Sequence, residues 1–144
     1  MKKILLVVVI AIVSYGIYQQ NPSVLSSFLG QVSHNEDPIR KAYENRESDV
    51  QVRGEGEVIR LLADDNDGSR HQKFIIRLST GQTLLMAHNI DLAPRINTLS
   101  EGDRIEFYGE YEWNSKGGVI HWTHHDPNGT HVGGWIKHRG KTYE

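Results

Sequence analysis

The sequence predicts an all-β domain, a small five-stranded antiparallel barrel, preceded by an N-terminal apolar helix and a short linker helix. Apolar and polar residues alternate along several stretches between residues 50 and 124, and turn residues separate these stretches. The residues before 49 lack this alternation. We therefore assign residues 49–144 to the barrel domain, 21–48 to a linker and 1–20 to a separate N-terminal segment.

The N-terminal segment has the layout of an export signal. Two lysines precede an unbroken apolar run from Ile4 to Val13, and polar residues follow from Gln19. Basic residues before such a run keep the N-terminus in the cytoplasm, so the rest of the chain is translocated. Ser14 and Gly16 are small enough for a cleavage site, but no Ala-x-Ala is present. We expect a cleaved signal sequence or a retained membrane anchor, and a periplasmic protein that is secreted after cleavage or tethered to the inner membrane.

The linker contains one short helical pattern. Asp37 can cap a helix, and Pro38 suits the first helical position. Ile39, Ala42 and Tyr43 then share one face at spacings i, i+3 and i+4.

Five stretches of the domain are predicted to be strands. The first begins at Val50 and contains Gly54 and Gly56, which indicate a sharp bend or a bulge. The others are His71–Ser79, Thr83–Ile90, Arg104–Trp113 and Val119–His124. Residues 91–99 are expected to form one or two helical turns, and Trp135–His138 with Lys141–Tyr143 a last small hairpin. From the alternation, we expect a core that contains Phe74, Ile76, Ile105, Phe107 and Trp122.

This order of elements matches the plan of an oligonucleotide/oligosaccharide-binding (OB) barrel. Such barrels have five strands, and their faces bind extended ligands. The bent first strand and the short insert between the third and fourth strands fit that plan. The alternative is another small antiparallel barrel or a sandwich.

Composition excludes several classes of function. The net charge is −2, from 16 basic and 18 acidic residues, so nucleic acid is not a favoured partner. Cysteine is absent, which excludes disulfides, thiol catalysis and thiolate metal sites. The sequence has no Gly-x-Ser-x-Gly motif and no glycine-rich phosphate loop, so we expect a binding protein rather than an enzyme.

Histidine is the unusual feature, because eight occur in 144 residues. Imidazole and carboxylate are ordinary ligands of zinc and copper. A divalent transition-metal site, in a metal-binding protein or a metal-dependent hydrolase, would use His88, His121, His124, His125 and Asp126. The alternative is that these histidines only pack or lie at the surface.

A second candidate site lies on the outward strand faces. Basic and aromatic side chains there could bind an anionic oligomer, a peptide or a small polar ligand. The residues are His71, Lys73, Arg77, Tyr108 and His121. The alternative is a solvated face on which these cations balance nearby glutamates. A third hypothesis is a structural envelope protein whose barrel edge pairs with a partner.

Four stretches together resemble a known family: residues 64–74 (DDNDGSRHQKF), 87–95 (AHNIDLAPR), 121–127 (HWTHHDP) and 134–138 (GWIKH). They are similar to a family of short exported bacterial proteins known as domain of unknown function 3465. The resemblance covers about residues 50–143 and implies a family but no activity.

The compartment is open to a direct test. A reporter enzyme that folds only where disulfides can form, fused after Glu144, should be active, because the basic leader and apolar run direct the domain out of the cytoplasm. Deletion of residues 1–20 is the control and should abolish reporter activity. Activity that survives this deletion would contradict export.

Overall fold

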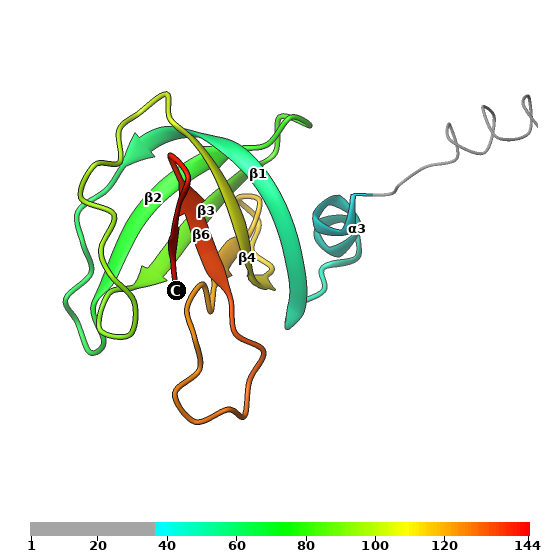
Figure 1. Ribbon diagram of the computed structural model, residues 1–144. Helices are drawn as coiled ribbons and strands as arrows, with labels where there is room; N and C mark the ends of the chain where they lie inside the picture. The colour runs from blue at the N-terminus through cyan, green and yellow to red at the C-terminus, as the bar shows by residue number, and fades with distance from the viewer. Residues whose placement is uncertain (1–36) are drawn as a thin grey trace, which may run out of the picture. The chain divides into compact units, whose positions relative to one another are not determined.

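The structure, a computed structural model, describes residues 37–144. The predicted N-terminal apolar helix, and with it the choice between signal sequence and membrane anchor, lies outside these residues. Within 37–144, no helix has the length and apolar character needed to cross a membrane. The described elements are α3 (Pro38–Asn45), β1 (Val50–Leu61), β2 (His71–Arg77), β3 (Thr83–Asn89), β4 (Arg104–Glu112), β5 (Val119–His121), β6 (Trp135–His138) and β7 (Lys141–Tyr143) (Figure 1).

Five of the strands form a closed barrel. They are hydrogen-bonded in the order β1-β2-β3-β5-β4, and β4 pairs with β1 to complete the circle. Four of these pairings are antiparallel, whereas β3 and β5 are parallel, with Leu85 opposite Val119 and Met86 opposite Ile120. The five-stranded barrel is confirmed, but the expectation of a wholly antiparallel one is wrong, because β4 follows β3 in the chain and β5 then inserts between them.

The first strand, β1, is hydrogen-bonded to two neighbouring strands. Val50 to Glu57 pair with β4, and Glu57 to Leu61 pair with β2. The register shifts between Val58 and Arg60, so the bulge lies beyond the two glycines that were expected to produce it. Gly54 instead permits close packing, since a Cβ there would lie 2.7 Å from Cζ of Phe107.

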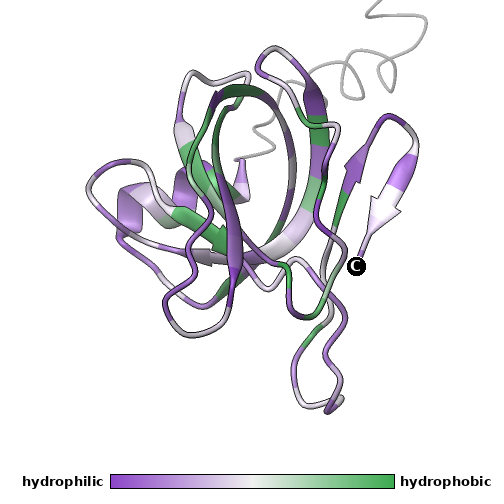
Figure 2. Ribbon diagram, turned by 90° about the vertical axis from the view of Figure 1, so that its left-hand side faces the viewer, coloured by the Kyte–Doolittle hydropathy of each residue, from purple (hydrophilic) through white to green (hydrophobic). Residues whose placement is uncertain are grey.

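The barrel interior is mostly apolar, with the buried polar side chains Gln72 and His88. Hydrophobic and hydrophilic residues alternate along the strands (Figure 2). Phe74, Ile76, Ile105 and Phe107 are buried as predicted. Trp122 is not part of this core: it is only half-buried, and its φ of 53° follows the end of β5 at His121, three residues earlier than predicted. The rest of the buried cluster comes mainly from the remaining strands and from both ends of the barrel.

The two ends of the barrel are closed by different segments. The predicted linker helix is confirmed as α3, where the Asp37 side chain accepts a hydrogen bond from the Ile39 N–H, and buried Ile39 and Ala42 cover the end where β1 begins. The segment that follows β3 covers the other end with Ile96. Residues 91–99 contain no helix, which corrects that prediction.

A buried side-chain amide supplies hydrogen bonds to the backbone of this segment, where a helix was expected. The Gln72 side chain accepts a hydrogen bond from the N–H of Ile96 at 2.9 Å and donates one to its carbonyl at 3.1 Å. The backbone polar groups of Ile96 are thereby satisfied without helical hydrogen bonds.

The predicted last hairpin is confirmed. Strand β6 pairs with the Ile105–Tyr108 part of β4, on the edge that β5 leaves free, and β7 pairs with β6. The hairpin therefore extends the sheet beyond the barrel, and the loop of residues 122–134 connects β5 to it.

The packing predicts a large effect of one truncation. Phe107→Ala should lower the free energy of unfolding by about 3–5 kcal/mol, because it opens a cavity beside Gly54 in the closed interior. Urea unfolding of the full chain measures it. Leu92→Ala is the control, since Leu92 is 44% exposed and its loss should cost less than about 0.5 kcal/mol. Equal effects of the two variants would mean that the inward face of β4 is assigned incorrectly.

Candidate functional site

A groove crosses the outer face of β2, β3 and β5. Its volume is about 390 Å³, and polar side chains flank an apolar floor that makes up most of the exposed lining. The floor is Leu85, Ala87 and Val119, and the walls are Asp65, His71, Lys73, Glu112 and His121.

Strand periodicity explains why these side chains meet. In β2, β3 and β5 the alternate residues Phe74, Met86 and Ile120 point into the core, so their neighbours point outward. The cross-strand register then places Lys73 beside Ala87. The parallel pairing of β3 with β5 brings His121 to the same face.

An ion pair between Lys73 and Asp65 forms one wall of the groove. The Lys73 Nζ lies 3.4 Å from Oδ2 of Asp65, and the Asp67 N–H donates to the other carboxylate oxygen at 3.1 Å. The Asp67 N–H and the Lys73 ammonium together lower the pKa of Asp65. Asp65 is itself held by reciprocal backbone hydrogen bonds with His71.

A smaller hollow of about 220 Å³ adjoins the groove. His71 and His121 line both spaces, and Asn89, Leu92, Trp122 and His124 complete the smaller one. The two spaces therefore lie next to each other, with His71 and His121 between them.

Two glutamates and two histidines cluster at the other wall. The Nε2 atom of His121 lies 3.1 Å from Oε1 of Glu110 and 3.6 Å from Oε1 of Glu112. The second oxygen of Glu110 lies 2.6 Å from Nε2 of His131. Nδ1 of His131 faces the Val132 carbonyl at 2.8 Å, so both ring nitrogens meet acceptors. The Glu110 carboxylate is the main cause of the raised pKa of His131.

The loop that carries His131 is organised by Asp126. Its carboxylate accepts hydrogen bonds from the N–H groups of Asn128, Thr130 and His131. These bonds to the charged form, chiefly those from His131 and Asn128, lower the pKa of Asp126 to about 2. The His131 ring stacks on Trp122, with 4.0 Å between ring centroids.

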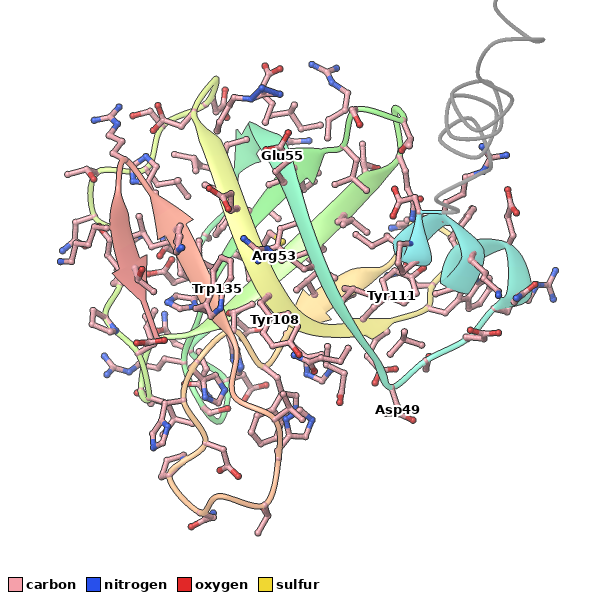
Figure 3. The ribbon with its side chains drawn as sticks, turned by 45° about the vertical axis from the view of Figure 1, so that its right-hand side comes forward. Asp49, Arg53, Glu55, Tyr108, Tyr111 and Trp135 are labelled. Carbon is pink, nitrogen blue, oxygen red and sulfur yellow. The ribbon has the colours of Figure 1, made fainter. Side chains whose placement is uncertain are left out.

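Three of the five residues predicted to bind a ligand meet in the groove: His71, Lys73 and His121. The other two lie elsewhere. Arg77 is near Glu57, with 3.8 Å between the charged atoms. Tyr108 faces Trp135, at 6.3 Å between ring centroids, on the outer surface of β4 and β6 (Figure 3).

The five predicted metal ligands do not form one cluster, although His121 and His124 both line the smaller hollow. His88 is fully buried, with ring nitrogens 2.8 Å from Oγ1 of Thr123 and 3.2 Å from the Pro94 carbonyl. His124 is buried and its Nδ1 faces the His125 carbonyl, while His125 is exposed. The Asp126 carboxylate accepts hydrogen bonds from the backbone of its own loop. Of the five, His121 alone belongs to a group of side chains that could hold a metal ion in residues 37–144.

Sequence reasoning did not identify Glu110, Glu112 and His131 as site residues. A signal for the glutamates was present, because Glu110 and Glu112 are two residues apart on the outward face of a strand. Counting back across the turn at 114–118 places Glu110 opposite His121, as the structure shows. His131 had no comparable signal, since its position depends on an irregular loop.

The fold and the site define a small closed β-barrel domain with a charged groove and an adjoining hollow on the outer surface of β2, β3 and β5. Residues 23–144 match the family described as "Protein of unknown function (DUF3465)", and the chain belongs to this family. The family membership that the sequence suggested is thereby confirmed. No curated protein matches the chain.

The buried His88 predicts a pH-dependent stability. Burial is the main cause that lowers the pKa of His88 from 6.5 to about 4, so the folded form stays neutral while the unfolded chain takes up a proton below pH 6.5. The free energy of unfolding should therefore fall as the pH drops from about 6.5 towards 4, by about 3 kcal/mol from this group.

Urea unfolding at pH 7.5 and pH 4.5 isolates this contribution. The His88→Gln variant should lose less stability on acidification than the natural chain, because its side chain does not titrate. His125→Gln, at an exposed position, should leave the difference between the two pH values unchanged. An identical acid dependence in His88→Gln and the natural chain would contradict the assignment.

Proposed function

We propose that the domain is a periplasmic binding module of the OB type, and that its ligand lies across β2, β3 and β5. The strand order β1-β2-β3-β5-β4 with closure on β1 supports the architecture. In OB barrels the ligand-binding face includes the second and third strands. The groove lies on this face, and the export signal predicted for residues 1–20 supports the compartment.

One observation carries the proposal. His71, Lys73 and His121 are separated by up to 50 residues, yet they line one groove around the floor of Leu85 and Ala87. Ligand sites typically combine an apolar surface with a few convergent polar groups.

The charges of the groove favour an extended peptide among the three predicted ligand classes. Lys73 stands at one wall, whereas Glu112 stands at the other and Glu110 lies behind His121. An anionic oligomer would meet repulsion at the glutamate wall, and the cation Arg77 lies outside the groove. A peptide can place a carboxylate or carbonyl at Lys73, a basic group at Glu112 and a side chain on the apolar floor.

The two other functional hypotheses have less support. A hydrolase built on the predicted His/Asp set would need Asp126, which is engaged by its loop. A structural protein would pair through a sheet edge. The edge strand β7 is short and carries Lys141, a charge of the kind that discourages pairing with another strand.

Peptides selected from a random phage library against the purified full-length chain provide the probe. A synthetic copy of one selected peptide should shift the backbone amide resonances of residues 71–73, 85–87 and 119–121. Lys73→Ala should weaken its binding at least tenfold, about 1.4 kcal/mol, because the wall of the groove loses its cation. Binding is measured by titration calorimetry.

The matched control is Arg77→Ala, which removes a second cation from the same outward face of β2 but outside the groove. Its affinity should equal that of the natural chain. Equal losses in both variants would show that only general charge matters, and resonance shifts confined to the Tyr108 and Trp135 surface would place the site elsewhere. An oligophosphate that binds more tightly than every peptide would refute the ligand class.

A further inference from the structure

We propose that Glu110, Glu112 and His121 form a binding site for a divalent transition metal, and that zinc is its ion. The proposal is separate from the peptide hypothesis, which concerns the groove without a metal, because a bound ion would neutralise the glutamate wall. It concerns ligands other than the His/Asp set expected from the sequence, with His121 as the one residue in common.

The placement of the three side chains follows from strand geometry. Glu110 and Glu112 are alternate residues of β4 and therefore point to the same side. His121 of β5 is the direct cross-strand partner of Glu110, and Glu112 is opposite Val119, two residues before His121. Two adjacent, paired strands thus fix the donors on a rigid surface, which suits a metal site better than a loop does.

Two of the three separations between donor atoms agree with a tetrahedral ion. One donor atom from each side chain lies within 4.8 Å of the other two. Ligands 2.0–2.2 Å from a tetrahedral zinc are separated from each other by about 3.4 Å. The separations of 3.1 Å and 3.6 Å from Nε2 of His121 to the two carboxylates span this value.

The hydrogen bonding of His121 supports a ligand role. Although 32% of the side chain is exposed, its Nε2 atom is buried and has no hydrogen-bond partner, with Oε1 of Glu110 3.1 Å away. A buried, unpaired polar nitrogen is costly. A cation between this nitrogen and the carboxylates would satisfy it and would reduce the repulsion between the two glutamates.

A second layer holds the glutamate in position. The remaining oxygen of Glu110 contacts Nε2 of His131 at 2.6 Å, and the His131 ring is fixed by stacking on Trp122. Hydrogen-bond partners of this kind orient metal-ligating carboxylates and are characteristic of metal sites in proteins. Glu110 itself is mostly buried, with 13% of its side chain exposed.

Among residues 37–144, three side chains form this group, so a fourth position is left for another donor. His121 and Glu112 also line the groove, and the open position therefore faces it. Zinc sites with three protein ligands keep this place for water or for a group of a bound molecule.

Titration of zinc sulfate into the purified full-length chain, after removal of metals with a chelator, tests the site. Calorimetry should give one ion per chain. His121→Ala and Glu112→Gln should each weaken binding at least tenfold. The exposed Glu106→Gln on the same face of β4 and the exposed His125→Ala should leave the affinity unchanged. Cobalt as a substitute should give the visible absorption bands of a tetrahedral site, and these bands should disappear in His121→Ala.

Far-ultraviolet circular dichroism and urea unfolding verify that each variant is folded, and Glu112→Gln keeps the size of the side chain. Three results would overturn the proposal. One is the absence of zinc binding. Another is weak binding that decreases a little with every histidine removed, as for adventitious capture. The third is an affinity that Glu106→Gln lowers as much as Glu112→Gln does.

Discussion

The barrel depends on one strand that pairs with two neighbours. The first half of β1 is hydrogen-bonded to β4 and the second half to β2, so β1 joins the beginning of the sheet to its end. The bulge at Val58–Arg60 marks the change of partner and provides the local bend. Without this shared strand the sheet would have open edges, and the inner and outer surfaces that define the core and the groove would not exist.

Closure also requires unusually close contacts between strands and side chains. A Cβ at Gly109 would lie 2.5 Å from the His121 carbonyl, so β4 and β5 can approach each other only because glycine is present there. Gly109 is adjacent to Glu110, and His121 belongs to the candidate site. The close approach of β4 and β5 at Gly109 therefore also sets how far apart the Glu110 and His121 side chains lie on the outer surface.

Local patterns predicted much of the fold. The α3 cap at Asp37, the alternation in β2 and β4 and the last hairpin depend on neighbouring residues, and the structure agrees with them. The parallel pairing of β3 with β5 could not be derived this way, because it joins residues that are 34 positions apart. The local pattern of residues 91–99 predicts helix, whereas the tertiary partner Gln72, which satisfies the backbone of Ile96, leaves no signal in that stretch.

The site was predictable to a similar extent. Alternation identified the outward positions of Lys73 and His121, and these do line one groove. The alternation did not predict the positions of the other histidines. The chain turns at Trp122, whose φ is 53°, so His121 and Asp126 are close in the sequence but do not share a strand face. Beyond that turn the chain leaves the sheet, and Asp126 orders its own loop.

The histidines of this chain therefore have different physical roles, which their number alone does not reveal. His88 is a neutral core residue between Thr123 and Pro94, and buried His138 contacts Asp103 at 2.8 Å. His131 supports Glu110. His121 differs from these three, because its buried nitrogen faces two carboxylates and has no hydrogen bond. Its place is set by the register of β4 and β5, so the chemistry of the candidate site follows from barrel closure rather than from the local density of imidazoles.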